Sequence, residues 1–373
     1  MELQNYIDDN LNNYITNFKN FGLVVKTFSK ENLILIKYKY NDDLSEDWMK
    51  YCRGCIIDTN TNKLIFIPPI KANEIEYPLT NTEDMNFFSD LFSKSDFEIT
   101  PLIDGTMINL FYHNDKWLMS SRSDIGCLNK WDNKFNFKKM FIESIKNENF
   151  YDYLNKHLTY SFVLINKNNR NISNIVDNFI VLIETYDTNT MCKIEIDNQI
   201  FKENKYIKIY TLENIKHTFK NITDIDKFYL LNDFNFKGLN IINNNIRYKM
   251  LNPIFIYVQN ICINSTNLFE KYIYLKKNNK IKLYLNYYPE FNNEFQNFSN
   301  KYDIMINELY DNYIKMRITK EIKLNDVPYQ LKPLIYNIHK IYLDTKKKIN
   351  KITIETYIKS LDSYKILFIL KYY

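Results

Sequence analysis

The first 250 residues show short apolar runs separated by polar turns, a pattern typical of strands. Residues 55–58 and 64–67 are two such runs, and the polar segment between them predicts a hairpin. The segment His113-Asn114-Asp115 predicts a second hairpin. Strands are predicted at 33–38, 55–58, 64–67, 106–112, 116–121, 159–165, 178–186, 191–196, 239–242 and 246–250. Residues 1–20 show helical spacing, so residues 1–253 are predicted to form a strand-rich α+β domain.

After Pro253 the pattern changes to apolar residues at helical spacing, with polar faces between them. Thr353, followed by Glu355, is a predicted helix start. Helices are predicted over 254–274, 297–316, 330–350 and 352–371. The sequence therefore predicts an all-α C-terminal domain over residues 254–373.

Composition adds a charge asymmetry to this picture. Hydrophobic residues make up 45% and charged residues 25%, as in an ordinary globular protein. The aromatic share of 16% and the 5 glycines are typical of a very AT-rich genome, such as that of a virus or plasmid. Residues 257–373 hold 19 Lys and Arg against 11 Asp and Glu, a net +8, which leaves −3 for the first 256 residues. Basic clusters at 276–282 and 346–348 suggest a polyanion partner, and a solvated helix face explains any single cluster equally well.

Other protein classes are not favoured. No stretch approaches the ~20 apolar residues of a membrane span, and residues 1–4 lack the basic-then-apolar pattern of a signal peptide. The five cysteines are odd in number and form no disulfide framework. Cys52 and Cys55 form one C-x-x-C pair, without the second pair that a structural zinc site needs. We therefore expect a cytoplasmic protein with no membrane partner and no metal site.

Seven ordered stretches carry candidate chemistry, and most of the scarce glycines fall within them. They are Cys52-Arg53-Gly54-Cys55-Ile56-Ile57-Asp58, Pro68-Pro69-Ile70-Lys71-Ala72-Asn73-Glu74, Pro101-Leu102-Ile103-Asp104-Gly105-Thr106, Ser120-Ser121-Arg122-Ser123, Thr159-Tyr160-Ser161-Phe162-Val163 followed by Asn169-Arg170, Phe236-Lys237-Gly238-Leu239-Asn240-Ile241 and Arg247-Tyr248-Lys249. In this order they resemble the motifs of the covalent nucleotidyltransferases, which comprise ligases and capping enzymes. The chain looks most like the RNA ligase 1 branch, the phage type that repairs cleaved tRNA anticodon loops. The resemblance covers nearly the whole chain and implies a nucleotidyltransferase domain with an ATP-grasp-like antiparallel sheet, followed by an all-α domain.

Three positions depart from the family pattern. Leu102 stands where the family has a lysine whose unprotonated amine attacks the α-phosphate of ATP. Val163 and Lys237 stand where the family has glutamates that hold ribose hydroxyls and a divalent metal. Leu102 offers no lone pair, Val163 accepts no hydrogen bond, and Lys237 puts a cation where the metal would bind. The resemblance therefore implies a degenerate member without a catalytic residue.

The positions that face phosphate in the family still carry Arg or Lys here. These side chains suit phosphate oxygens. The predicted nucleotide- or phosphate-binding residues are Arg53, Lys71, Asp104, Gly105, Arg122, Arg170, Gly238, Arg247 and Lys249. The alternative for each cation is that it is an ordinary surface charge. The alternative for Asp104 and Gly105 is that they are kept only because the backbone turn requires them. The acidic segment 184–187 is interpreted as a turn, with a carboxylate near the cleft mouth as the alternative.

Three functions follow as hypotheses. The first is a catalytically inactive RNA-ligase-like protein whose cleft and basic C-terminal domain, residues 254–373, bind RNA, tRNA in particular. It requires no cofactor, and residual ATP binding stays open. Such a protein could shield tRNA from an anticodon nuclease, as an immunity or antitoxin factor with that nuclease toxin as a protein partner. The second hypothesis is an active ATP-dependent RNA ligase that uses another lysine, such as Lys71 or Lys94. The third is a structural or protein-interaction subunit that reuses the fold.

Overall fold

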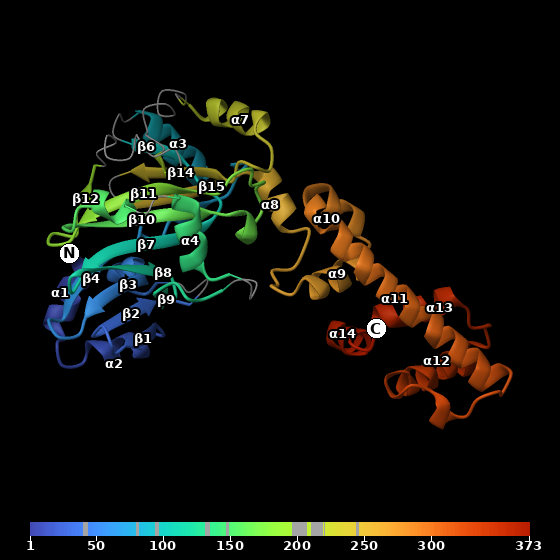
Figure 1. The fold of residues 1–373 in the computed structure, drawn as a ribbon. Helices are drawn as coiled ribbons and strands as arrows, with labels where there is room; N and C mark the ends of the chain where they lie inside the picture. Colours follow the sequence, from blue (N-terminus) through green and yellow to red (C-terminus); the bar gives the residue numbers. More distant parts are fainter. Residues whose placement is uncertain are drawn as a thin grey trace. The chain divides into compact units, whose positions relative to one another are not determined.

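The chain divides into two compact units, residues 1–256 and 257–373 (Figure 1). The computed structural model describes residues 1–39, 44–79, 82–93, 97–130, 135–146, 149–195, 207–209, 219, 221–243 and 246–373. Within these residues the first unit contains three sheets and the helices that cover them, and the second unit is helical.

The first sheet is antiparallel, with strand order β1 (Val24–Phe28), β2 (Leu33–Lys37), β3 (Arg53–Asp58) and β4 (Lys63–Phe66). Strands β2 and β3 are nearly continuous apolar runs because both of their faces are covered. Ile34 and Ile57 pack with helices α1 (Glu2–Asp9) and α2 (Tyr14–Asn20). Leu35 and Ile56 pack instead against Phe111, which belongs to the second sheet.

The second sheet is the largest. Its strand order is β12 (Lys193–Ile194), β11 (Phe179–Asp187), β10 (Leu158–Ile165), β7 (Thr106–His113), β8 (Lys116–Ser121) and β9 (Asp124–Ile125), and β13 (Ile207–Ile209) pairs in parallel with β11. One face packs Ile108, Phe162 and Leu164 against α4 (Phe137–Ile145). Short 3-10 turns, η2 (Phe150–Tyr153) and η3 (Lys167–Asn169), flank β10. The other face carries the candidate site.

The third sheet has the order β5 (Asn73–Ile75), β15 (Ile246–Leu251), β14 (Gly238–Asn243) and β6 (Phe97–Pro101), with β5 and β15 parallel. Helices α3 (Thr82–Ser93) and α7 (Ile222–Leu231) supply Phe88 and Tyr229 to the core beside Ile241. The hydroxyl of Tyr229 donates a 2.7 Å hydrogen bond to the backbone oxygen of Met250, so the polar end of this buried ring is satisfied.

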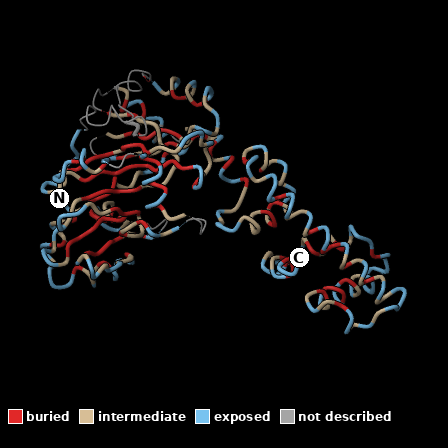
Figure 2. The backbone as a smooth tube through the Cα atoms, in the orientation of Figure 1, coloured by how far each residue is buried: buried red, intermediate tan, exposed pale blue. Residues whose placement is uncertain are grey.

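The helical unit follows α8 (Pro253–Gln259), which spans the boundary between the two units. Its elements are α9 (Leu268–Lys277), α10 (Ile281–Tyr287), η4 (Pro289–Phe291), α11 (Asn292–Tyr313), the π-helical turn η5 (Ile314–Ile318), η6 (Leu324–Asp326), η7 (Tyr329–Leu331), α12 (Lys332–Thr345), α13 (Lys351–Ser360) and α14 (Ser363–Leu370). The apolar stripe of each long helix faces the unit's interior, where aromatic rings such as Tyr272 and Phe295 contact edge to face. Buried and exposed residues accordingly alternate along these helices (Figure 2).

The α+β class and the helical C-terminal region are confirmed, and each predicted strand coincides at least in part with an observed one. Two predicted helices are interrupted: 254–274 becomes α8 and α9, and 352–371 becomes α13 and α14. Asp362 causes the second break, because its side chain accepts from Tyr364 N and caps a new helix. The predicted start at Thr353 is wrong, since the cap is Asn350, whose side chain accepts from Thr353 N.

Residues 1–20 are largely helical, as predicted, and form the two helices α1 and α2. Helices α3, α4 and α7 are not predicted from the pattern, and neither is β6. Among the described helices none is both long and apolar enough to cross a membrane.

Candidate functional site

The loop between β6 and β7 is held by the carboxylate of Asp104. Its Oδ2 accepts hydrogen bonds from the backbone N–H groups of Ile172 (2.9 Å) and Ser173 (3.0 Å), and Asn171 Nδ2 lies 3.5 Å from Oδ1. The Asp104 side chain is only 6% exposed. Asp104 thus anchors the loop that follows η3, and this structural role accounts for its presence.

Gly105 allows the same loop to lie directly against β10. A Cβ atom at this position would lie 2.5 Å from the backbone oxygen of Leu164 and 2.6 Å from Cγ1 of Val163. Both distances are too short for non-bonded atoms, so a larger residue fits only if β10 moves. The close approach places Val163 beside the Asp104-Gly105 turn.

Leu102 and Lys237 meet this turn as well. The backbone N–H of Leu102 donates to the backbone oxygen of Gly238 at 2.8 Å. Lys237 Nζ lies 3.6 Å from Asp104 Oδ1, and 5.8 Å from the centroid of the Phe255 ring. The Lys237 ammonium therefore partly balances the negative charge of the Asp104 carboxylate. All three positions that depart from the ligase pattern gather at one turn.

An apolar row of the second sheet borders the turn. Met107 pairs with Val163 and Val163 pairs with Val181, so their side chains lie on one face of the sheet. Val163 and Val181 are buried in a cluster that Ile103 and Ile165 join. A carboxylate at position 163 would lose its hydration in these surroundings. This row behaves as core and not as a binding surface.

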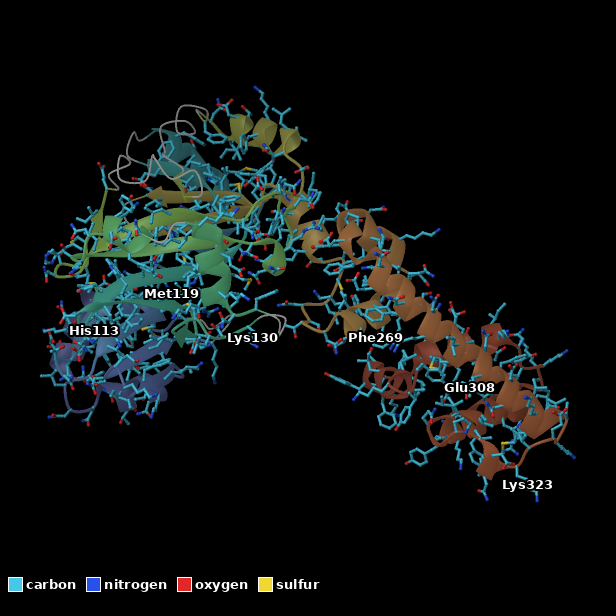
Figure 3. The ribbon with its side chains drawn as sticks, viewed as in Figure 1. His113, Met119, Lys130, Phe269, Glu308 and Lys323 are labelled. Carbon is cyan, nitrogen blue, oxygen red and sulfur yellow. The ribbon has the colours of Figure 1, made fainter. Side chains whose placement is uncertain are left out.

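The next row of the same face is polar and buried. Asn109 pairs with Ser161, and Ser161 pairs with Glu184. A bulge in β11 leaves Ile183 without a partner on β10, and this extra residue turns Glu184 to the face of Ser161. Among the described residues, Asn109 Oδ1 and Ser161 Oγ have no hydrogen-bond partner, which suits a bound polar group or water. Met119, labelled in Figure 3, lies on the neighbouring strand β8.

Arg247 of β15 reaches this polar row and forms an ion pair with Glu184. The hydroxyl of Tyr186 donates to Glu184 Oε2 at 2.7 Å. Both charged side chains are at least nine-tenths buried. The pKa of Arg247 is lowered to about 10, mainly by burial and to a smaller extent by repulsion from Arg53. Arg247 is thus engaged inside the protein, and the interpretation of residues 184–187 as a turn is wrong because Glu184 lies within β11.

A second group of cations surrounds the ring of Tyr38, at the end of β2. Lys71 Nζ lies 5.5 Å and Arg122 Cζ lies 5.0 Å from the ring centroid, and Arg122 Nη2 donates to the backbone oxygen of Tyr38 at 3.1 Å. Burial raises the pKa of Tyr38, whereas the positive charges of Arg53 and Arg122 oppose that rise. Gly54, at φ +107°, brings β3 to this point, because a Cβ there would lie 3.1 Å from the Arg122 backbone.

The other predicted cations are engaged elsewhere. Arg170 Nε and Nη2 donate to the backbone oxygens of Ser173 (3.2 Å) and Ile172 (3.0 Å), so its guanidinium braces its own loop. Lys249 Nζ lies 2.8 Å from Glu74 Oε2 in an exposed ion pair. Apart from Arg247 and Lys249, the predicted residues thus form two clusters. The turn cluster consists of Leu102, Asp104, Gly105, Val163, Arg170, Lys237 and Gly238, and the Tyr38 cluster consists of Arg53, Lys71 and Arg122.

Two residues of this site are not found from the sequence. Tyr38 is one of 31 tyrosines, and nothing in the pattern singles it out. Lys37 donates from Nζ to Ser123 Oγ at 2.8 Å, and its pKa is lowered by burial and then by the charges of Lys26 and Arg122. Lys94, the other lysine considered as a nucleophile, lies outside the described residues.

The residues present fit a phosphate group better than a divalent metal. Guanidinium and ammonium groups around Tyr38 suit phosphate oxygens. Metal-dependent nucleotide chemistry needs carboxylates that converge on one ion. Across the part of the chain that the structure describes, no group of three or more His, Cys, Asp or Glu side chains is placed to hold a metal. The cations around Tyr38 therefore have the charge that an anion requires, whereas Asp104 and Arg170 of the turn cluster hydrogen-bond within the protein.

Comparison with known proteins gives a viral sequence relative. No protein-family model matches the chain. Over 160 residues, 40% of this chain, the sequence is 22% identical to a protein of Autographa californica nuclear polyhedrosis virus. That protein is provisionally described as a bifunctional polynucleotide kinase/RNA ligase. The match covers 23% of it, so the chain spans less than a quarter of the relative's length.

The chain is also similar to solved structures of RNA ligases and of a DNA ligase. An archaeal ATP-dependent RNA ligase is 10% identical with a TM-score of 0.42, over 71% of this chain and 64% of that one. A protein of Aquifex aeolicus, provisionally described as an ATP-dependent DNA ligase, is 13% identical with a TM-score of 0.41, over 89% and 80%. An apo RNA ligase of Naegleria gruberi is 15% identical with a TM-score of 0.33, over 46% and 54%. All three TM-scores lie below 0.5.

Proposed function

We propose that this protein is a catalytically inactive, RNA-ligase-like protein that binds RNA through its phosphates. The observation that carries the proposal is the contrast between the two clusters. Around Asp104 an apolar Val163 and the Lys237 ammonium occupy the turn, whereas Lys71 and Arg122 gather on the ring of Tyr38. The first cluster lacks the groups for nucleotide activation, and the second keeps groups that bind phosphate.

The absence of an amine at position 102 supports the lack of catalysis. Lysyl-adenylate formation requires that an uncharged amine attack the α-phosphate, form a P–N bond and release pyrophosphate. The Leu102 side chain has no nucleophilic atom. Binding through the Tyr38 cluster needs no such step and no cofactor, and ATP remains a candidate anion for it.

We further propose that the RNA is tRNA and that binding shields it from an anticodon nuclease. This part of the proposal derives from the resemblance to tRNA-repair ligases. It is tested by nuclease cleavage of tRNA anticodon loops with and without the protein. Protection that is lost in Arg53→Ala supports it, and unprotected cleavage at a saturating protein concentration would contradict it.

Two measurements test the proposal as a whole. Incubation with α-labelled ATP and Mg²⁺ or Mn²⁺ should leave the protein unlabelled after denaturation. A binding titration with tRNA should show affinity at low salt that falls steeply as salt rises, because phosphate contacts release counterions. A covalent protein–AMP adduct would refute the inactive assignment. The absence of RNA binding at low salt would favour a structural or protein-interaction subunit.

An active RNA ligase that uses another lysine is the second candidate, and one observation favours it. The pKa of Lys37 is lowered by burial and by two neighbouring cations, which increases its uncharged, nucleophilic fraction. Lys71 lies on the same Tyr38 ring as Arg122. If an adduct forms, peptide mapping decides between Lys37 and Lys71, and Lys→Arg at the modified position should abolish labelling.

A further inference from the structure

Positive charge in the helical unit is concentrated in one segment. Residues 313–348 hold nine Lys and Arg against three Asp and Glu, a net +6 of the +8 carried by residues 257–373. The nine cations are Lys315, Arg317, Lys320, Lys323, Lys332, Lys340, Lys346, Lys347 and Lys348. Lys323, labelled in Figure 3, lies in the connection between the π-helical turn η5 and α12. Over the described residues none of the nine forms an ion pair, so no carboxylate of the chain neutralises their charge at close range.

Aromatic side chains are interleaved with these cations. The guanidinium Cζ of Arg317 lies 5.3 Å from the centroid of the Tyr336 ring. The His339 ring stacks on Tyr342, with centroids 5.7 Å apart and an angle of 22° between the planes. Burial, and to a smaller extent the charge of Arg317, lowers the pKa of His339. Two pairs of planar groups, Arg317 with Tyr336 and His339 with Tyr342, therefore lie along α12.

The π-helical turn positions the arginine of the first pair. Thr319 N donates to the backbone oxygen of Ile314 at 3.0 Å, five residues earlier, and Arg317 lies within this widened turn. Such turns are uncommon and recur at functional sites. Among the described residues, Arg317 Nε and His339 Nδ1 are shielded from solvent without a hydrogen-bond partner.

The aromatic rings on this side of α12 are open to solvent. Tyr336 is 49% exposed and Tyr329, in the preceding turn η7, is 76% exposed. Leu334, Ile335 and Ile338 lie on the opposite side of the helix and are buried. We call the exposed side the α12 face, which consists of Arg317, Tyr329, Lys332, Tyr336, His339 and Lys340.

We propose that the α12 face binds single-stranded RNA, with bases stacked on its exposed tyrosines and phosphates held by its lysines. This inference rests on the proposed RNA-binding function and adds the surface and the form of RNA that it takes. Exposed rings between unpaired cations suit unstacked bases on a phosphate backbone. Duplex RNA fits this face less well, because its bases are already stacked on one another and cannot stack on the tyrosines. An acidic protein could pair with the lysines but has no bases to stack on the rings.

The test compares full-length variants in a fluorescence-anisotropy titration. The probe is a labelled single-stranded RNA of about 12 nucleotides, and the same sequence as a duplex is the second probe. Tyr336→Ala should weaken single-strand binding about 10-fold, since one stacked base is lost, while Tyr336→Phe should bind like the parent. The duplex affinity should change little in either variant.

A second pair of variants measures the charge contribution. The double variant Lys332→Gln with Lys340→Gln should lower the slope of log affinity against log salt by about 1.4, because two phosphate contacts at ~0.7 each are lost. The matched control is Lys359→Gln, a cation of the same unit that is already paired with Glu355. It should leave the slope unchanged. Thermal unfolding followed by circular dichroism verifies that each variant is folded.

The outcomes separate this inference from the proposed function. If Tyr336→Ala and the double lysine variant both bind like the parent while Arg53→Ala loses RNA, the α12 face is refuted and RNA binding stands. If the parent chain binds no RNA at low salt, both proposals fail. If polyglutamate competes as well as RNA and Tyr336→Ala has no effect, the face serves an acidic protein and the RNA assignment is overturned.

Discussion

The two units use their cations in opposite ways. The first unit has a net charge of −3, and several of its cations are held by partners inside it. Arg247 pairs with buried Glu184, Lys237 with Asp104, and Lys249 with Glu74. In the helical unit the charged segment 313–348 has a net +6, and none of its nine cations is paired within the described residues.

The difference shows that net charge alone does not locate a binding surface. A buried cation with a carboxylate partner contributes to the fold and little to the external potential, because the two charges cancel at a distance. An unpaired cation beside an exposed ring acts on a partner directly. In the first unit, Lys71 and Arg122 lie on the ring of Tyr38, which is buried, whereas Tyr336 in the helical unit is exposed. Four experiments would break or sharpen the comparison.

The largest expected effect is on the stability of the first unit. Arg247→Met leaves the Glu184 carboxylate buried without its cation, so the free energy of unfolding should fall by about 3–5 kcal/mol. The matched control Lys249→Met breaks an exposed ion pair and should cost at most about 1 kcal/mol. Urea denaturation of the full chain measures both. Equal losses would show that burial does not separate the two pairs.

The second effect concerns the apolar row. Val163→Glu places a carboxylate among Met107, Val181 and other apolar side chains, and should cost at least about 2 kcal/mol of unfolding free energy. Val176→Glu, at a valine that is 77% exposed, is the control and should change stability by less than about 0.5 kcal/mol. A stable Val163→Glu protein in the same denaturation experiment would mean that the row tolerates a charge, as a nucleotide site would.

The third effect is on binding. Arg53→Ala should weaken RNA binding about 10-fold and lower the salt slope by about 0.7, since one charge-assisted phosphate contact is lost. Lys30→Ala, at an exposed lysine in the turn between β1 and β2, should bind RNA like the parent. Anisotropy titrations at several salt concentrations measure both. Identical affinities for the two variants would confine RNA binding to the helical unit.

The smallest expected effect is none at all. Leu102→Lys restores the amine, but Val163 and Lys237 still supply no carboxylate for ribose or metal. Incubation with α-labelled ATP should therefore give no adduct. Labelling of this single variant would show that the positions of Val163 and Lys237 had been misinterpreted.

Local patterns explain which parts of the fold could be predicted. Strands such as β7 and β8 are short apolar runs around polar turn residues, and these cues act over only a few residues. The spacing of apolar residues continues across Asp362, so the pattern does not predict the break between α13 and α14. The break depends on the hydrogen bond from Tyr364 N to the Asp362 side chain, which caps a new helix. Helices α3, α4 and α7 carry cues too weak for the pattern alone, since each is stabilised by the sheet it covers.

For the site, the sequence by itself determined which chemical groups are available. It supplies no amine at Leu102 and no carboxylate at Val163, and it keeps the cations Arg53, Lys71 and Arg122. It also places an excess of positive charge in the last third of the chain. These properties belong to residue types and their order, so no fold is needed to see them.

The tertiary structure alone decided how those groups are used. The bulge in β11 turns Glu184 inward to meet Arg247, which removes a predicted phosphate ligand from the surface. The contact of Gly54 with the Arg122 backbone brings two distant motifs to the ring of Tyr38. Pairing between segments far apart in the sequence depends on register and close approach, and a one-residue bulge reverses the face on which a charge appears.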